Sequence, residues 1–336
     1  MTRPCARCVL TEDFPGVRLD EAGLCQHCAA VPVGASIADE RARMESELHS
    51  TIERLRGTGP YDCIVAFSGG KDSSFTLKLL VERYGVRCLA VMVDNGFVSG
   101  RALENGRAVS EALGVDLVTY RPAPTFMRTM YRRSAIGPEL HAPAAAIRAS
   151  SICSSCIGLI NSYVVRMSVE QGIPMVAAGY LAGQIPKRSS VVTIDVGAQA
   201  RLRAKSIGTY SRAFGPDAAA YFALPDVLPG ERTLTLLCPM LTTSASEEEI
   251  IREIEPLGWV LPSDTGRNST NCRLNDLGIV VHLRRHGIHP YAFEIAEQVR
   301  YGLMNREEGM AKLRSVPEAT DVSQQARAIG IPIGEL

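Results

Sequence analysis

The feature that most constrains the fold of this chain is a glycine- and serine-rich run between a predicted strand and a predicted helix. The run reads SGGKDS and covers residues 68–73, between the apolar segment 63–67 and the helix-like segment 74–84. Adjacent glycines let a backbone approach a ligand closely, and N–H groups at the start of a helix attract anions. The spacing of the residues differs from that of the Walker loop. The run therefore predicts an anion-binding turn in a strand–loop–helix unit.

Apolar, β-rich segments alternate with helical patterns through the middle of the chain. Near-continuous apolar strands separated by helices indicate a doubly wound α/β fold with a buried parallel sheet. Ligands of such sheets bind beyond the carboxyl ends of the strands, where we expect Ser68 and Asp94. We predict strands at residues 63–67, 88–93, 117–121 and 175–178, and helices at residues 74–84, 100–113 and 157–171.

Four segments follow from the composition along the chain. Residues 122–152 and 183–235, inside the third of these segments, are expected to be irregular and to lie near the ligand. The segments are a zinc-ribbon-like finger at 1–35, a connector helix at 36–60, the parallel-sheet domain at 61–240 and a helical C-terminal region at 241–336.

Charge and the N-terminal sequence restrict partners and location. Lys and Arg together number 36, as do Asp and Glu, so the formal net charge is zero. This balance argues against a large RNA-binding surface, although four basic residues cluster within 201–212. The chain opens with MTRPCARC rather than an apolar signal segment, and we find no apolar run of about 18 residues or more. We therefore expect a cytoplasmic protein that does not span a membrane.

The first cysteine pattern predicts a metal site. In the cytoplasm, cysteines at such spacings are more often metal ligands than disulfide partners. Cys5 and Cys8 form one Cys-x2-Cys pair, and Cys25 and Cys28 form a second. Two such pairs suit a tetrahedral Zn²⁺ site of the ribbon type, and four thiolates leave no open position for a substrate. We therefore predict a structural role for the zinc, with a substrate-presenting finger as the alternative.

The second cysteine pattern combines a close pair with a distant residue. Cys153 and Cys156 form a Cys-x2-Cys pair, and Cys238 follows much later in the chain. Cysteine thiolates hold iron–sulfur clusters, and a cluster held by only three of them is what the resemblance described below implies. The pair could instead be a redox pair or a loop feature, and Cys238 a buried core residue. Cys272 competes with Cys238 as the third ligand.

The run SGGKDS resembles the pyrophosphate loop of the ATP pyrophosphatase (PP-loop) superfamily. Its members cleave ATP between the α and β phosphates and adenylylate a substrate oxygen. The resemblance covers about residues 60–240 and marks 61–240 as a PP-loop ATP-binding domain, similar to the adenine nucleotide alpha hydrolases. It implies that Asp72 helps to hold Mg²⁺, since magnesium takes oxygen ligands. The nucleotide-binding residues that it implies are Ser68, Gly69, Gly70, Lys71, Asp72, Ser73, Asp94 and Gly179.

Two groups within this superfamily share more of the pattern. Residues 5–28 resemble the N-terminal finger of N-acetyl sugar amidotransferase-like proteins. The tRNA thiolases with a [4Fe–4S] cluster share the cysteine spacing, because Cys153 follows Ser68 by 85 positions and Cys238 follows Cys156 by 82. Those thiolases carry a histidine-containing motif after the fourth strand. This chain keeps its glycine and lacks its histidine and acidic residue.

The thiolase resemblance implies an ATP-dependent sulfur transferase. A substrate carbonyl oxygen would attack the α phosphorus of ATP, and Lys71 and the loop amides would stabilise the developing charge. Sulfur from a [4Fe–4S] cluster on Cys153, Cys156 and Cys238 would then replace AMP. We expect a small metabolite or carrier-bound acyl group as substrate, with tRNA less favoured. A sulfur donor protein and homodimerisation through the finger are compatible with this function.

Two alternatives stay open. The first is an amidotransferase that uses the same adenylylation and receives ammonia from a separate glutaminase partner. In that case the second group of cysteines binds zinc or nothing. The second alternative is a non-catalytic module that binds adenine nucleotides without releasing pyrophosphate.

Overall fold

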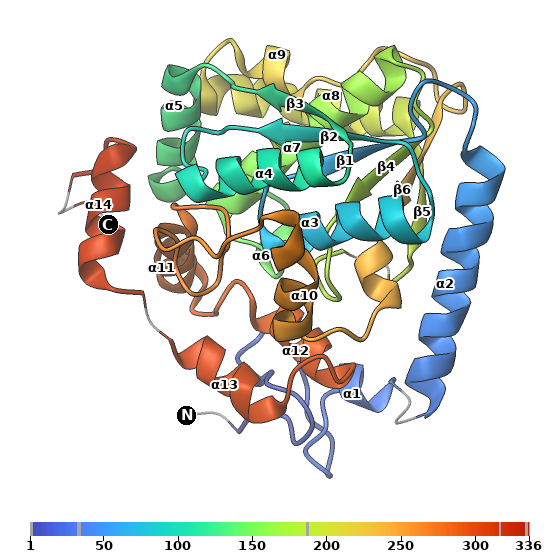
Figure 1. Cartoon of the computed structure of the whole chain (residues 1–336). Helices are drawn as coiled ribbons and strands as arrows, with labels where there is room; N and C mark the ends of the chain where they lie inside the picture. Colours follow the sequence, from blue (N-terminus) through green and yellow to red (C-terminus); the bar gives the residue numbers. More distant parts are fainter. Residues whose placement is uncertain (1–2, 32–34, 186–187, 316, 333–334, 336) are drawn as a thin grey trace.

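A computed structural model of the chain describes all residues except 1–2, 32–34, 186–187, 316, 333–334 and 336. Its centre is a six-stranded sheet in the order β3-β2-β1-β4-β6-β5 (Figure 1). All pairs are parallel except that β5 runs antiparallel to β6. The predicted α/β class is confirmed. The strands are β1 (Cys63–Phe67), β2 (Cys88–Val93), β3 (Asp116–Tyr120), β4 (Met175–Ala178), β5 (Val191–Asp195) and β6 (Thr233–Leu237).

Helices cover both faces of the sheet and build the C-terminal region. A π-helical turn, Leu79–Arg83, continues α3, and short 3₁₀ turns follow β6 and α10 at Pro239–Thr242 and Glu255–Leu257. The α-helices are α1 (Gln26–Ala29), α2 (Ala35–Leu55), α3 (Lys71–Lys78), α4 (Gly100–Ala112), α5 (Pro124–Ile136), α6 (Pro143–Ala146), α7 (Ser151–Glu170), α8 (Val196–Phe214), α9 (Ala218–Phe222), α10 (Glu247–Ile254), α11 (Asn275–His286), α12 (Ala292–Arg300), α13 (Arg306–Arg314) and α14 (Ala319–Ala328).

Each face of the sheet is buried by its own helices. Successive side chains of a strand point to opposite faces. Val65 and Phe67 of β1 therefore join one core with α2, α3 and α4, whereas Ile64 joins a second core with α7. Helix α2 lies where the connector helix was predicted, and its Leu48 and Ile52 are fully buried in the first core.

The chain changes direction across the sheet at β1. Strands β2 and β3 lie on one side of β1, and β4 and β6 lie on the other. In open parallel sheets, ligands bind at the carboxyl ends of the strands that flank such a switch point. The loop at residues 68–73 follows β1 and Gly179 follows β4, so the topology brings both to this place.

Most strand predictions agree with the structure, and the predicted irregular segments do not. Strands 63–67, 88–93 and 175–178 are found as predicted, and the third strand begins one residue early, at Asp116. The prediction of irregular segments at 122–152 and 183–235 is wrong. The first segment contains the helices α5 and α6, and the second contains β5, α8, α9 and most of β6. Gly197 lowers the helix propensity of α8, but a Cβ there would lie 2.4 Å from the backbone of Leu228. The close packing outweighs the propensity.

Helix α7 begins at Ser151, earlier than the predicted 157, and so includes Cys153 and Cys156. Among the described residues it is the one helix long and apolar enough, by length and composition, to cross a membrane. The search of the sequence for an apolar run did not find it. Val164 and Val165 of α7 pack against the sheet, which accounts for part of its apolar composition.

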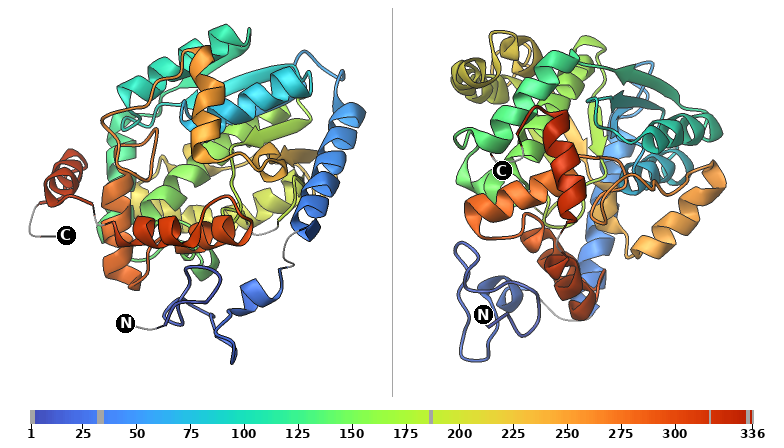
Figure 2. Two further views of the ribbon diagram at one scale, coloured as in Figure 1. Left: turned by 60° about the horizontal axis from the view of Figure 1, so that its bottom comes forward. Right: turned by 90° about the vertical axis from the view of Figure 1, so that its left-hand side faces the viewer.

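The N-terminal finger lies against the C-terminal helices and away from the sheet (Figure 2). Its cysteines share a buried cluster with Ala292, Phe293 and Ala296 of α12. Phe14 of the finger stacks on Phe293, with ring centroids 6.0 Å apart. The finger and the helical C-terminal region therefore stabilise each other, although they stand at opposite ends of the sequence.

Candidate functional site

Hydroxyl groups hold the loop after β1 in one conformation. Ser73 Oγ donates a hydrogen bond to the carbonyl of Gly70 at 3.1 Å, and it lies 3.2 Å from the backbone N–H of Ser68, which donates to it. Gly69 has a φ of +69°, and a Cβ there would lie 1.9 Å from the carbonyl oxygen of Ala102. Only glycine fits this position. Helix α3 begins at Lys71, within the run 68–73, so the unpaired N–H groups of its first turn belong to the loop itself.

A cavity of about 700 Å³ opens beside this loop. Its wall combines the loop, the ends of β1 and β4, the first turns of α7, the segment 267–272 and helix α12. The volume is typical of small-molecule sites, which measure about 300–1,000 Å³. Six of the predicted nucleotide-binding residues line it, namely Ser68, Gly70, Lys71, Asp72, Ser73 and Gly179.

Lys71 and Asp72 form an ion pair inside the cavity. The ammonium of Lys71 lies 2.8 and 2.9 Å from the two carboxylate oxygens of Asp72. Burial lowers the pKa of Lys71, but the charges of Asp72, Glu247 and Glu294 outweigh this effect, so that its pKa is raised. The lysine is therefore a permanent cation at the start of α3, where an anionic ligand gains most from it.

Gly179 and Asp94 have different surroundings. A Cβ at Gly179 would lie 2.8 Å from the backbone of Asp72, so glycine lets β4 approach the start of α3. Asp94 is not part of the cavity wall, although its neighbours Val93 and Asn95 are. Its carboxylate accepts a hydrogen bond from the N–H of Gly96 at 3.0 Å. Asp94 thus stabilises its own turn, next to the cavity.

Residues 267–272, which we name the strap, close over the loop. The hydroxyl of Thr270 accepts a hydrogen bond from the N–H of Lys71 at 3.1 Å. The N–H of Ser99 donates to the carbonyl of Asn271 at 2.8 Å and ties the strap to the turn after β2. Trp259, just before the strap, donates its indole N–H to the carbonyl of Gly69 at 3.0 Å. The C-terminal region is therefore part of the site.

Three cysteines from two distant segments line the same cavity. Cys153 and Cys156 lie three positions apart on α7 and so share a helix face, and Cys272 ends the strap. Burial raises the pKa of Cys153 to about 11 and also raises the pKa of Cys272, to which the neighbouring thiols contribute. Tyr131 donates to the sulfur of Cys156 at 3.1 Å, and Asn95 donates at 3.4 Å. The structure therefore gathers three thiols in the cavity beside the loop 68–73.

Cys238 lies elsewhere. It is fully buried among Met44, Ala182, Leu241 and Tyr301, and it is not part of the cavity wall. Burial alone raises the pKa of its thiol to about 12. The structure thus places Cys272, and not Cys238, with the α7 cysteines. The apolar sequence TLLCPM before and after Cys238 is the signal that indicated a core residue.

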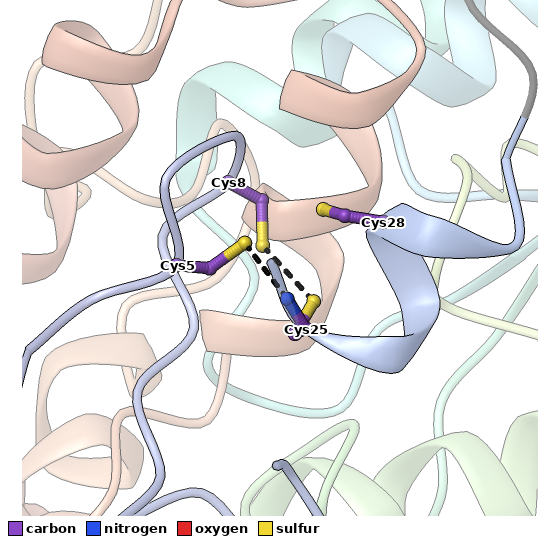
Figure 3. Close-up of side chains that lie close together, drawn as sticks. All are labelled: Cys5, Cys8, Cys25 and Cys28. Atoms are coloured by element: carbon purple, nitrogen blue, oxygen red, sulfur yellow. Dashed lines mark hydrogen bonds between the residues drawn. The ribbon is translucent and has the colours of Figure 1, made fainter. Parts of the chain in front are cut away.

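The four finger cysteines gather around one point, as predicted (Figure 3). Their sulfur atoms all lie within 4.8 Å of one another, and no other group of three or more His, Cys, Asp or Glu among the described residues gathers its ligand atoms this closely. The sulfurs of Cys8 and Cys25 are 3.8 Å apart. Two thiolates about 2.3 Å from a tetrahedral Zn²⁺ ion would be about 3.8 Å apart. The group could therefore hold one metal ion.

A buried arginine connects the finger to α12. Arg300 donates to the sulfur of Cys8 at 3.3 Å and pairs with Glu297 at 2.5 Å, and its side chain has no exposed surface. Its positive charge offsets the negative charge that four thiolates around a divalent ion would carry. Glu294, on the same helix, lines the cavity instead. Helix α12 thus contacts the finger cysteines directly, and it also lines the cavity that contains the other group of cysteines.

Sequence reasoning did not find Glu294 or Thr270. Glu294 lies in an ordinary helical pattern, and Thr270 lies in a polar segment that reads as a loop. Neither has a local signal, because Thr270 is hydrogen-bonded to Lys71 and Glu294 interacts electrostatically with Lys71 and Asp72, all more than 190 positions away in the sequence.

Comparison with known proteins gives partial similarities. No protein-family model matches the chain. An uncharacterized protein of Methanocaldococcus jannaschii is 28% identical over 295 residues, which span 87% of this chain and 86% of that protein. The glutamine-hydrolyzing GMP synthase of Yarrowia lipolytica is 36% identical over 93 residues, and that of Eremothecium gossypii is 34% identical over 87 residues. These two matches span 27% and 25% of this chain but only 18% and 17% of the synthases.

Among solved structures, the U34-tRNA thiolase NcsA of Methanococcus maripaludis with its [4Fe–4S] cluster has a TM-score of 0.36 and 15% identity. The comparison covers 95% of this chain and 91% of that chain. The chain is therefore similar in sequence over most of its length to a protein of unassigned function, and over about a quarter to GMP synthases.

Proposed function

We propose that this chain is an ATP pyrophosphatase of the AMP-forming type that transfers sulfur to an adenylylated substrate. The observation that carries the proposal is that one cavity at the switch point of the sheet joins the loop 68–73 to Cys153, Cys156 and Cys272. In such a cavity, the oxygen of a bound substrate can be activated and then replaced by sulfur while the substrate stays bound.

The loop and its helix suit the triphosphate of ATP. The N–H groups at the start of α3 and the ammonium of Lys71 bind phosphate oxygens, which would displace the hydroxyl of Thr270 from the N–H of Lys71. The substrate carbonyl oxygen attacks the α phosphorus, and pyrophosphate leaves. Lys71 and the amides stabilise the charge that develops on the leaving group.

The three cavity cysteines suit a [4Fe–4S] cluster. Cubane thiolates bind separate iron atoms and stand farther apart than thiolates that share one zinc ion. The three thiols line one cavity and, unlike the finger cysteines, do not all lie within 4.8 Å of one another. When bound, the cluster would supply an iron with an open position for sulfur. Tyr131 and Asn95 orient the sulfur of Cys156. The backbone N–H of Cys153 donates to the N-cap hydroxyl of Ser150 at 3.2 Å, which fixes the first turn of α7.

The finger suits a structural Zn²⁺ ion. Its thiolates are buried and close around one point, so a bound ion has no open position. The ion would hold together a segment that is too small to have a core of its own, and it would fix that segment on α12.

Pyrophosphate release tests the proposal. Anaerobically purified protein is incubated with ATP, Mg²⁺ and fractions of small metabolites, and pyrophosphate is measured for wild type and Lys71→Ala. We expect Lys71→Ala to reduce the rate at least about 100-fold, the scale of losing one charge-stabilising donor. Lys78→Ala is the matched control, because Lys78 lies on the same helix but pairs with Glu82 and Glu253 outside the cavity. An unchanged rate in Lys71→Ala would remove the loop from catalysis.

The two GMP synthase matches favour a second candidate, an amidotransferase that receives nitrogen derived from glutamine. Metal analysis separates the two. About four irons and four acid-labile sulfides per chain after anaerobic reconstitution support sulfur transfer. Zinc alone, with pyrophosphate release that depends on ammonium, supports nitrogen transfer. Nucleotide binding without pyrophosphate release in any fraction would instead indicate a non-catalytic module.

A small metabolite or a carrier-bound acyl group remains the substrate class that we propose. The cavity volume of about 700 Å³ suits ATP with a small acceptor. A larger anionic substrate such as tRNA would instead bind at a basic region of α8. This region consists of Arg201, Arg203, Lys205 and Arg212.

A further inference from the structure

One carboxyl group in the cavity has no use in the reaction described above. Glu294 is only 8% exposed, and it lines the cavity from α12. Its Oε1 accepts a hydrogen bond from Gln298 at 3.0 Å. Its Oε2 has no hydrogen-bond partner within 3.5 Å among the described residues, although the side chain of Gln184 lies near enough to lower the pKa of the carboxyl group. A buried carboxylate oxygen without a partner is costly, so an unpaired one at a cavity wall indicates a ligand.

The surroundings of Glu294 show which ligand fits. Glu294 faces the pair formed by Lys71 and Asp72 closely enough for their charges to shift its pKa. Burial raises the pKa of Glu294 to about 7, and the negative charge of Asp72 adds to this effect. The side chain of Gln184 and the charges of Lys71 and Lys312 offset it only in part. Two carboxyl groups, one from α12 and one from α3, thus line the same cavity. A further cation between them would relieve their repulsion.

Gly183 makes this approach possible. A Cβ at Gly183 would lie 2.7 Å from the Cα of Glu294, and the φ of Gly183 is +90°. The loop after β4 and α12 are thus packed backbone against backbone at this point. The carboxyl group of Glu294 is held by rigid elements rather than by a surface loop.

We propose that Glu294 and Asp72 together hold the Mg²⁺ ion that accompanies ATP. Magnesium at nucleotide sites is held by one or two carboxylates together with phosphate oxygens and waters. When the ion binds Asp72, the ammonium of Lys71 is free to turn from that carboxylate to a phosphate. The inference rests on the proposed function, because the phosphates on the loop supply the remaining ligands.

Manganese binding tests the assignment. Mn²⁺ replaces Mg²⁺ as a spectroscopic probe, and α,β-methylene-ATP replaces ATP because it cannot be cleaved between its α and β phosphates. Binding of Mn²⁺ to the complex of protein and analogue is followed by electron paramagnetic resonance. We expect Glu294→Gln to raise the Mn²⁺ dissociation constant about tenfold or more and to leave analogue binding without metal within about threefold.

Glu247→Gln is the matched control. Glu247 lines the same cavity, but its carboxylate is already paired with Lys312 at 2.9 Å. We expect it to raise the Mn²⁺ dissociation constant less than about threefold, which measures the general effect of removing one negative charge. Glu294→Asp, which keeps the charge, is expected to bind Mn²⁺ more tightly than Glu294→Gln, and thermal unfolding checks that all variants are folded.

The outcomes separate this inference from the proposed function. Equal Mn²⁺ affinity in wild type and Glu294→Gln, or equal losses in Glu294→Gln and Glu247→Gln, would overturn the metal assignment while ATP binding stands. Failure of the wild type to bind the analogue, with or without metal, would overturn the proposed function and the inference with it.

Discussion

The two Cys-x2-Cys regions of this chain have the same spacing and different geometry. In the finger, Cys5 and Cys8 lie in a turn and the second pair opens the short helix α1, so that four thiols meet around one point. In the cavity, Cys153 and Cys156 lie on a long helix and point along one face of it. Only a third cysteine from another segment completes the second group.

The comparison teaches that the backbone under a cysteine pair decides what the pair can bind. Tight turns bring two thiols close enough to share one metal ion. A helix holds thiols at positions i and i+3 on one face but leaves them open to a cavity. The finger is therefore closed and suits a structural ion, and the cavity cysteines are open to a ligand.

The largest expected effect separates the two regions by stability. Cys25→Ser leaves three thiolates in the finger, so we expect the variant to lose about one zinc ion per chain. We also expect its Tm to fall by more than about 10 °C, because structural zinc contributes folding free energy directly. Cys153→Ser is expected to keep the zinc and to change Tm by less than about 3 °C. Metal analysis and thermal unfolding give both values. Zinc loss in Cys153→Ser would show that the two regions are not independent.

The next effect concerns the third cysteine of the cavity. After anaerobic reconstitution, we expect Cys272→Ser to lose the bound iron and Cys238→Ser to retain about four irons per chain. Cys238→Ser has its own cost of about 1–3 kcal/mol, because a hydroxyl replaces a thiol in an apolar site. The finger zinc is the internal control in both variants. Iron retained in Cys272→Ser and lost in Cys238→Ser would reverse the assignment.

The smallest effect tests the turn before α12, the helix that joins the two regions. His289 is 6% exposed, and its Nδ1 accepts a hydrogen bond from the N–H of Tyr291 at 3.2 Å. Burial lowers its pKa to about 4 from 6.5. Between these values the unfolded chain binds the proton and the folded chain does not, so stability falls as the pH falls from about 6.5 to 4, by about 3 kcal/mol.

Asn at position 289 keeps an acceptor and does not titrate. We therefore expect His289→Asn to lose about 3 kcal/mol less than wild type between about pH 7 and pH 4. Urea unfolding at the two pH values measures this difference. The same acid-induced loss in both proteins would show that His289 takes up its proton as readily in the folded state as in the unfolded chain.

Much of the fold was predictable from the sequence because its signals are local. The strands β1, β2 and β4 are apolar and bounded by polar turns, so their ends agree with the prediction. The antiparallel edge strand β5 is only partly buried and has no clear pattern, and it was missed. Helix α8 was also missed, because its glycines lower the helix propensity of the segment, whereas close packing stabilises the helix in the structure.

The site was predictable only in part. The loop 68–73 and the finger cysteines carry their own patterns and were found from these patterns. The loop after β4 lacks an acidic residue, and the structure brings Glu294 to it from α12. Spacing along the chain selected Cys238 as the third cysteine, whereas folding brings Cys272 to the cavity.

The sequence by itself determined the elements that depend on neighbouring residues, namely the glycine loop at the start of a helix, the alternation of strands and helices, and the two thiol turns of the finger. The tertiary structure decided which distant residues meet, that is, the third cysteine, the second carboxylate and the helix on which the finger rests. The physical reason is that turn geometry and helix propensity act within a few residues. The meeting of α12, the strap and the loop after β1 instead depends on how the whole core packs.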